Sequence, residues 1–302
     1  MDCTLGAAGH AWGILEASSP DGLLLGLDLD PQALEIARTR LEPFSERAIL
    51  LQASYTTLQE QLRALGWGAV NGILLDLGVS SMQFDTPQRG FSFQADAPLD
   101  MRFDPHSRLR ASDLVNDLSE EELAQLIYRY GEEEQARKIA HAIVRARPVN
   151  TTTELAAILL SLSGGNQGAK GRQKKGSGRN IHPATRTFQA LRIAVNRELE
   201  ALESVLPQAV AALAPGGRLA VVAFHSLEDR IVKQFFRRES RDCLCPPRQP
   251  VCTCGHKATL IELTRRPVMP DPEEVSQNPR SRSARLRVAE RVSNSSQLPA
   301  GD

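Results

Sequence analysis

The stretch Asp2-Cys3-Thr4-Leu5-Gly6-Ala7-Ala8-Gly9-His10 decides the fold of this chain. It reads as the end of a strand, a turn of small residues and the start of a helix, and such a turn lets backbone approach a nucleotide-like ligand. The pattern downstream alternates between apolar runs and amphipathic segments. We expect strands at Leu23–Leu27, Ala48–Gln52 and Val70–Leu75, and helices at Pro31–Leu41 and Thr57–Leu65. This order predicts an α/β fold with a doubly wound, Rossmann-like parallel sheet.

The alternation of strands and helices stops near Pro105. From 111 to 162 the pattern is helical, with Thr151–Glu154 forming a Thr cap and capping box. After a further helical stretch from Ala184 to Leu213, strands are expected at 217–224, 258–264 and 285–290. Because these late strands need a sheet to join, we predict one α/β domain with an inserted all-helical domain. The predicted boundaries are 1–104 and 184–302 for the two parts of the sheet domain and 105–183 for the insertion.

The 302 residues carry 36 basic and 36 acidic side chains, but the cations are gathered in two segments. No acidic residue lies between Glu154 and Glu198, and a second basic segment runs from Arg265 to Arg291. Such segments favour contact with a polyanion, although a solvated loop would explain the first one equally well. The candidate RNA-binding cations are Lys170, Arg172, Lys174, Lys175, Arg186 and Arg192. Arg186 and Arg192 lie six positions apart, so one of them is free to form an internal ion pair instead.

The apolar runs are shorter than the roughly 18 residues of a membrane span, and no secretory signal opens the chain. We therefore expect a cytoplasmic protein without a membrane partner. Cysteine is concentrated in one segment, as Cys243, Cys245, Cys252 and Cys254. Their C-x-C spacing is tighter than that of most structural zinc sites, so we expect reduced thiols in a proline-rich loop and no metal, with zinc as the alternative.

Three further residues are expected beside the turn of small residues. Asp28 follows the strand after the turn, where its carboxylate can accept hydrogen bonds from ribose hydroxyls, or else cap the next helix. Tyr55 is placed to pack on an adenine or against the core, and Asp76 ends the next strand. The Gly6-x-x-Gly9 spacing lacks the third glycine of dinucleotide enzymes. This spacing favours S-adenosylmethionine as the cofactor. The alternative is a nicotinamide cofactor, and the protein would then be a dehydrogenase.

Long motifs then appear in a fixed order. They are Asp76-Leu77-Gly78-Val79-Ser80-Ser81-Met82-Gln83-Phe84-Asp85, Arg89-Gly90-Phe91-Ser92-Phe93, Pro98-Leu99-Asp100-Met101-Arg102, the segment from His182 to Arg192, and the segment from Phe224 to Arg230. With these motifs the chain resembles the ribosomal RNA small subunit methyltransferase H family, also called the MraW type, from Asp2 to about Arg291. The resemblance implies a class I S-adenosylmethionine-dependent methyltransferase that methylates N4 of a cytidine in the decoding region of 16S rRNA, in the small ribosomal subunit.

The resemblance also implies cofactor contacts, which are Ala8, Gly9, His10, Asp28, Tyr55, Asp76 and Gln83. Family members usually have glycine where this chain has Ala8, a change that costs about 1 kcal/mol if the position needs a positive φ. The family also has some tens of residues before Asp2, so we expect a misassigned start rather than a fragment or a reduced pocket.

The methyl donor is already activated, so the protein must align the reactants and accept a proton from the amino nitrogen. Asp76 is the first candidate catalytic acceptor, and His225 and Glu228 are the second candidates. His225 could equally be a structural histidine. Phe91 and Phe93 are candidate surfaces for stacking of a base or, alternatively, part of the core. A second hypothesis is a catalytically weakened homologue that binds RNA during small-subunit assembly. The sequence leaves the oligomeric state open, with a homodimer as one alternative.

Overall fold

The chain folds into two compact units, and the first of them contains both ends of the sequence. The computed structural model describes residues 1–163, 182–247 and 249–293. One unit comprises Met1–Gly78 together with Leu199–Asp302, and the other comprises Val79–Glu198.

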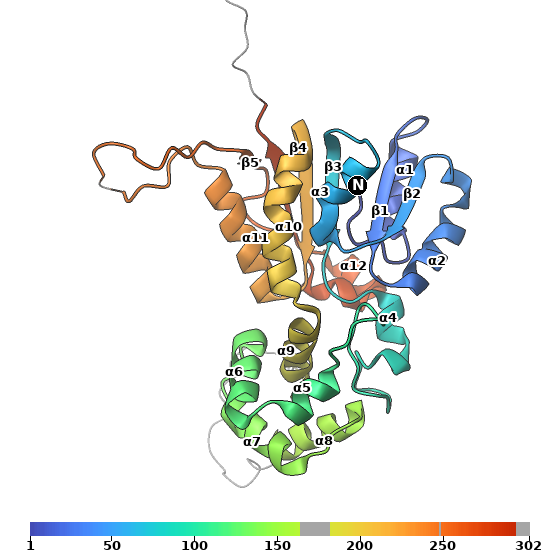
Figure 1. Ribbon diagram of the computed structural model, residues 1–302, viewed down its shortest axis with the longest axis vertical. Helices are drawn as coiled ribbons and strands as arrows, with labels where there is room; N and C mark the ends of the chain where they lie inside the picture. The colour runs from blue at the N-terminus through green and yellow to red at the C-terminus, as the bar shows by residue number, and fades with distance from the viewer. Residues whose placement is uncertain (164–181, 248, 294–302) are drawn as a thin grey trace, which may run out of the picture. The chain divides into compact units, whose positions relative to one another are not determined.

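The first unit is built on a mixed sheet (Figure 1). Its strands are β1 (Leu24–Asp28), β2 (Ala48–Gln52), β3 (Val70–Asp76), β4 (Leu213–Ala223), β5 (Leu260–Glu262) and β6 (Arg285–Arg291). Its helices are α1 (Gly9–Ala17), α2 (Pro31–Arg40), α3 (Leu58–Ala64), α10 (Glu198–Ala212, which enters the unit at Leu199), α11 (Ser226–Glu239) and α12 (Pro272–Gln277), with short 3-10 turns at Glu42–Phe44, Tyr55–Thr57 and Pro279–Ser283.

The first residues of the chain join the two halves of this sheet. β1 pairs with β2 in parallel, and β3, β4, β6 and β5 form the other half, in which β6 is antiparallel to β4 and β5. Asp2 forms parallel bridges to both Gly26 of β1 and Leu74 of β3. The order is therefore β2-β1-Asp2-β3-β4-β6-β5. This is the doubly wound sheet that the sequence predicts, except that β6 runs antiparallel to β4 and β5.

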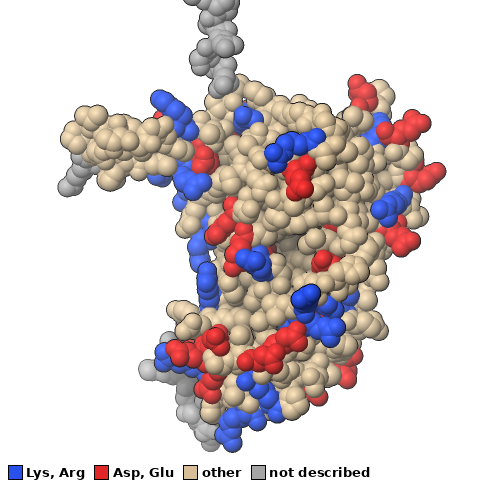
Figure 2. Space-filling model, in the orientation of Figure 1, with Lys and Arg blue, Asp and Glu red and all other residues tan. Residues whose placement is uncertain are grey.

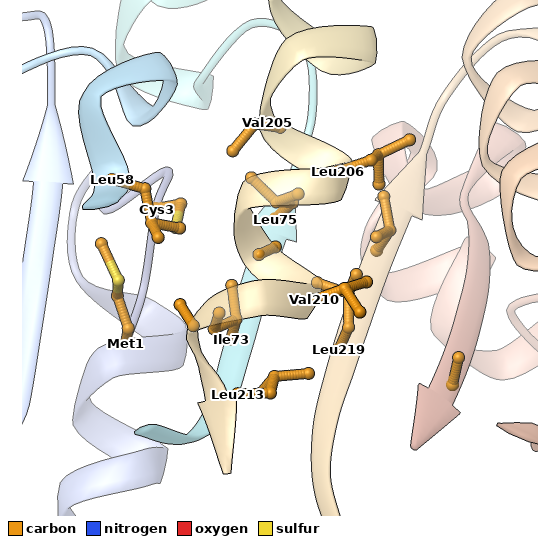
Figure 3. Packing of buried hydrophobic residues seen from close by; sticks show 14 of the residues in the cluster. Met1, Cys3, Leu58, Ile73, Leu75, Val205, Leu206, Val210, Leu213 and Leu219 are labelled. Carbon is orange, nitrogen blue, oxygen red and sulfur yellow. The ribbon is translucent and has the colours of Figure 1, made fainter. Parts of the chain in front are cut away.

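Two hydrophobic clusters cover opposite faces of the sheet. Leu25 and Leu27 of β1 belong to a large cluster with β3, β4, α3, α10 and α11, whereas Leu24 belongs to a smaller one with α1 and α2. Since neighbouring side chains of a strand point to opposite faces, the two clusters lie on either side of the sheet. Figure 3 shows side chains of α10 packed against those of β3 and β4, with Cys3 beside them.

The predicted strands and helices of the first hundred residues are confirmed to within one residue at each end. The helical stretch expected from Ala184 to Leu213 is also confirmed. It consists of two helices, because Arg197 adopts a left-handed conformation with φ 50° and ends the first of them. β4 also begins at Leu213, earlier than expected, with a shift of register between Val70 and Gly72 of β3.

The second unit is helical. Its helices are α4 (Ser81–Asp85), α5 (Ala111–Asp117), α6 (Glu120–Gly131), α7 (Ala136–Ala146), α8 (Thr152–Ser163) and α9 (Ala184–Asn196), with a 3-10 turn at Pro87–Arg89. The expected capping box is present, because Glu154 accepts a hydrogen bond from the Thr151 amide and the Thr151 hydroxyl accepts one from the Glu154 amide.

This helical unit extends further at both ends than the insertion predicted at 105–183. Its hydrophobic cluster includes Phe91, Leu99 and Met101 before that range and Phe188 and Leu191 after it. These residues pack with the helices of the insertion, although the local pattern of their sequence is that of loops and of a separate helix.

Among the residues that the structure describes, no helix has the length and apolar character needed to cross a membrane. Figure 2 shows acidic and basic side chains interspersed over the visible face of the first unit.

Candidate functional site

The candidate site of the first unit lies at the carboxyl end of its parallel strands. The parallel segments of the sheet end at Asp2, Asp28, Gln52, Asp76 and Ala223, so the loops that follow them emerge at one edge. In open α/β sheets this edge is where ligands bind. Most of the candidate cofactor and catalytic residues are located here.

The turn of small residues adopts the conformation that its composition suggests. Gly6 has φ 50°, and Ala8, directly before α1, has φ 59°. Arg40 of α2 donates a hydrogen bond to the carbonyl of Ala7 at 3.2 Å, which ties the turn to the next helix. Ala8 is fully buried and belongs to the cluster beneath α1. Its methyl group therefore packs into the core, and the cost of its left-handed backbone, about 1 kcal/mol, is offset by that burial.

Asp28 is held in one orientation by two backbone amides. Its Oδ2 accepts a hydrogen bond from Gly6 at 2.8 Å, and its Oδ1 accepts one from Asp30 at 2.9 Å. The cap of α2 is provided by Asp30, which accepts from the Gln32 amide, and not by Asp28. Burial raises the pKa of Asp28, and the amides of Asp30 and Gly6 offset part of that effect. A fixed, half-buried carboxylate beside the turn can accept hydrogen bonds from a ligand.

Asp76 and His10 form a pair across this edge of the sheet. The distance between His10 Nε2 and Asp76 Oδ2 is 3.4 Å, and 57% of the His10 side chain and 31% of the Asp76 side chain are exposed. The hydrogen bond that the His10 imidazole donates to Asp76 raises the pKa of His10 above its ordinary value of 6.5. The amide of Asp76 donates to the hydroxyl of Thr4 at 2.6 Å, which fixes the end of β3 against the turn.

Asp2 is a further residue of the site, for which the sequence alone predicts no role. It is only 1% exposed, and its Oδ1 accepts a hydrogen bond from the Thr4 amide at 3.1 Å. Burial raises its pKa to about 6, with His10 and Asp76 among the charges that act on it. Within the described residues, Asp2 Oδ2 and Asp76 Oδ1 are buried without a hydrogen-bond partner. The position of Asp2 at the end of a strand, directly before the turn, was the signal for it.

Comparison with known proteins identifies the family. The model of the MraW methylase family matches residues 1–292. The chain belongs to this family. It is 51% identical over 292 residues to the ribosomal RNA small subunit methyltransferase H of Dehalococcoides mccartyi, covering 97% of this chain and 80% of that protein. It is 53% identical over 297 residues to the protein of the same name from Thermomicrobium roseum, covering 97% and 88%.

Among solved structures, an rRNA methylase from Streptococcus thermophilus aligns with 96% of this chain and 84% of its own, at 9% identity and a TM-score of 0.39. Membership of the MraW methylase family confirms the resemblance seen in the motifs. It also confirms the prediction of a methyltransferase that uses S-adenosylmethionine.

Two cofactor contacts expected for this MraW methylase have additional structural roles. Tyr55 begins a 3-10 turn after β2, and its half-buried ring packs against the large hydrophobic cluster. Gln83 lies in the helical unit, where it is 5% exposed and its side chain accepts a hydrogen bond from the Ser80 amide in the capping box of α4. Their contact with a cofactor stays a prediction.

The second pair of candidate acceptors in this MraW methylase, His225 and Glu228, caps α11. Glu228 Oε2 accepts hydrogen bonds from the amides of Phe224 and His225 at 2.9 and 3.3 Å, and His225 Nδ1 accepts one from the Glu228 amide. Nε2 of His225 lies 3.1 Å from Glu228 Oε1, and the side chains are 7% and 2% exposed. The geometry favours the structural interpretation of His225, because both side chains are used at the start of the helix.

The candidate RNA-binding residues fall into three groups. Lys170, Arg172, Lys174 and Lys175 lie outside the described residues. Arg186 is half exposed and lies 3.4 Å from Glu133. Arg192 forms a two-point ion pair with Glu198, at 2.8 and 2.9 Å, and only 17% of its side chain is exposed. The interpretation of Arg192 as a phosphate contact is therefore corrected to an internal ion pair.

Packing decides between the two alternatives for the aromatic residues after β3 in favour of the core. Phe91 stacks on Phe103, and Phe93 stacks on His182 at 4.4 Å and meets the edge of Phe188, so both rings are part of the core of the helical unit. In the basic segment near the C-terminus, Arg287 is 3% exposed and paired with Asp229. Not all cations of that segment are thus available to a polyanion.

Proposed function

We propose that this protein transfers a methyl group from S-adenosylmethionine to N4 of a cytidine in the decoding region of 16S rRNA. Sequence similarity and one structural observation support this proposal. The relatives at 51% and 53% identity are named ribosomal RNA small subunit methyltransferase H. The choice of N4 of cytidine rests on the motifs that resemble the family, and the pairing of Asp76 with His10 is the structural observation that agrees with it.

The backbone and carboxylate groups at the edge of the sheet fit the proposed cofactor. The turn Gly6–His10 and the carboxylate of Asp28 provide a backbone surface and an oriented acceptor for a ribosyl group. Asp2 and Asp76 each have one buried carboxylate oxygen without a donor in the described structure. Acceptors of this kind favour a ligand with an ammonium group, which the methionine part of S-adenosylmethionine has. When bound, the cofactor supplies a methyl group already activated by its sulfonium.

Asp76 is the group that we assign to the amino nitrogen of the base. The lone pair of cytosine N4 is delocalised into the ring, so an acceptor for one of its protons makes the nitrogen a better nucleophile. Oδ2 of Asp76 is the oxygen that faces His10, and the Asp76 side chain is partly exposed at the edge of the sheet. We assign to Asp76 the acceptance of the proton that the nitrogen releases, with His10 as the neighbouring group to which it passes.

This assignment gives a pH dependence with a definite sign. His10 is neutral above its raised pKa, and Asp76 is then free to accept a proton. As the pH falls through that pKa, the imidazolium pairs with Asp76 and competes with the amino group. The rate of methyl transfer should therefore rise with pH above 6.5 and reach a plateau once His10 is neutral.

The deciding experiment uses labelled S-adenosylmethionine and small ribosomal subunits that lack the modification, followed by nucleoside analysis. Label in N4-methylcytidine is the expected result, and label in uridine, a ribose or C5 of cytosine would refute the proposal. Asp76→Asn should lower the rate by at least about 100-fold, the usual contribution of a general base. Asp21→Asn is the matched control, because Asp21 is exposed and precedes β1 at the opposite edge of the sheet.

Cofactor binding separates the proposal from the hypothesis of a weakened homologue. We expect measurable affinity for S-adenosylmethionine, because Ala8 is accommodated in the core beneath α1. Equilibrium dialysis with the labelled cofactor measures it. Absence of binding, together with retained binding to 16S rRNA, would favour a non-catalytic role in assembly.

A further inference from the structure

The segment 240–259 of the first unit connects α11 to β5 and extends away from both (Figure 1). None of its described residues belongs to the three hydrophobic clusters of the molecule. Its large apolar side chains are solvent-exposed, Leu244 by 41% and Val251 by 71%. A loop of this length without a buried core needs another interaction to hold one conformation.

The four cysteines of the loop bring their sulfur atoms together. Sγ of Cys252 lies 3.5 Å from that of Cys243, 3.9 Å from that of Cys245 and 3.6 Å from that of Cys254. The sulfur atoms of Cys254 and Cys243 are 3.9 Å apart, and all four lie within 4.8 Å of one another. The sulfurs thus form one compact group, to which both C-x-C pairs contribute.

These distances match a tetrahedron of thiolates around one metal ion. Zinc binds thiolate sulfur at about 2.3 Å in tetrahedral geometry, which places neighbouring sulfurs about 3.8 Å apart. A disulfide would require about 2.05 Å. Cys252 is nearly equidistant from three other sulfurs, so the arrangement does not select two pairs for disulfide formation.

Backbone amides are directed at the sulfurs in a reciprocal pattern. Leu244, the middle residue of the first C-x-C pair, donates its amide to Cys254 of the second pair at 3.3 Å. Thr253, the middle residue of the second pair, donates its amide to Cys245 of the first at 3.4 Å. Hydrogen bonds from amides stabilise thiolates, and such outer contacts are a regular part of metal sites. The short C-x-C spacing is what places each middle amide opposite the other pair.

We propose that Cys243, Cys245, Cys252 and Cys254 bind one Zn²⁺ ion, which fixes the loop between α11 and β5. The thiols release their four protons to solvent as the four Zn–S bonds form, with no change of oxidation state. His256 is not needed as a ligand, since its Nε2 lies 3.2 Å from the carbonyl oxygen of Arg238. Four sulfur ligands make a closed site, which is structural and not catalytic. The sulfur geometry thus reverses the preference for metal-free thiols that the spacing suggested.

The metal content of the 302-residue chain tests this proposal directly. The protein is purified under reducing conditions without chelators, and its zinc and iron are measured by plasma mass spectrometry. We expect about one zinc ion per chain, as for a closed four-thiolate site. The double variant Cys243→Ser/Cys254→Ser should lose the zinc. Cys3→Ala is the matched control, because Cys3 is buried in the core of the sheet and should leave the zinc content unchanged.

Replacement of the metal by Co²⁺ gives a second readout that is independent of activity. Four thiolates around Co²⁺ should produce intense sulfur-to-cobalt absorption in the wild type and in Cys3→Ala, but not in the double variant. Three results would overturn the proposal: zinc-free protein with four freely reactive loop thiols, a mass lower by four hydrogen atoms through two disulfides, or iron in place of zinc. The wild-type measurement decides between these even if the double variant is insoluble.

Discussion

Replacement of Asp2 by asparagine should stabilise the first unit in a strongly pH-dependent manner. Burial raises the pKa of Asp2 from 3.8 to about 6. At 1.36 kcal/mol per pKa unit, this difference corresponds to about 3 kcal/mol. Below pH 3.8 the folded and unfolded states both hold the proton, and Asp2 has no effect on the free energy of unfolding. As the pH rises to about 6, the unfolded state releases its proton first, so the folded state loses stability by the full amount.

Asparagine at position 2 cannot ionise, so the variant avoids this loss while keeping an acceptor for the Thr4 amide. The gain over the wild type should be about 0.5 kcal/mol at pH 4 and about 3 kcal/mol at pH 7, where it corresponds to about 6–12 °C in Tm. Both tryptophans, Trp12 and Trp67, lie in the first unit, so their fluorescence reports its unfolding. Thermal scans from pH 4 to pH 8 measure the difference, with Asp21→Asn as the control for loss of an exposed carboxylate.

A Tm difference between Asp2→Asn and the wild type that does not change with pH would refute this reasoning. It would mean that the Asp2 carboxylate is solvated or paired in the folded protein. A gain in Tm with the expected pH dependence, accompanied by weaker binding of S-adenosylmethionine, would instead show that the Asp2 carboxylate lowers stability but contributes to ligand binding.

Three other predictions test single features. Burial alone would raise the pKa of Asp229, but its hydrogen bonds with Arg287 and Arg285 hold the pKa below the ordinary value. Asp229→Ala should lower the free energy of unfolding in urea by about 3–5 kcal/mol, because the buried Arg287 loses its partner at 2.6 Å and keeps only Glu262 at 4.0 Å. A loss below about 1 kcal/mol would contradict this. Ala8→Gly should change the free energy of unfolding by less than about 1 kcal/mol, because relief of the left-handed backbone and loss of a buried methyl group oppose each other. A large gain in cofactor affinity, measured by dialysis, would show that the methyl group obstructs the ligand. RNA binding should weaken as salt increases. Neutralising four cations should reduce the slope of log affinity against log salt concentration by about 2.8, at about 0.7 per phosphate contact on single-stranded RNA. A slope that stays the same in filter-binding measurements would exclude these cations as phosphate contacts. These cations are Lys170, Arg172, Lys174 and Lys175.

Local patterns in the sequence were sufficient for the sheet. The apolar run of β1, the helix with Pro31 at its first turn and the small residues from Gly6 to Gly9 act over a few positions, so their structure follows from neighbouring residues. The position of Asp28 and Asp76 at one edge also follows, because parallel strands end together. The break of the helix at Arg197 did not follow, because arginine has no local preference for a left-handed conformation.

By itself, the sequence determined the order of strands and helices, the family and the edge of the sheet where the site lies. Only the tertiary structure decided which charges are neutralised, because the partners come from distant elements: Asp229 of α11 pairs with Arg287 of β6. The same holds for Asp2, whose burial between β1 and β3 makes its ionisation costly. The four cysteine sulfurs converge for a related reason, since their distances depend on how the loop folds back and not on the spacing along the chain.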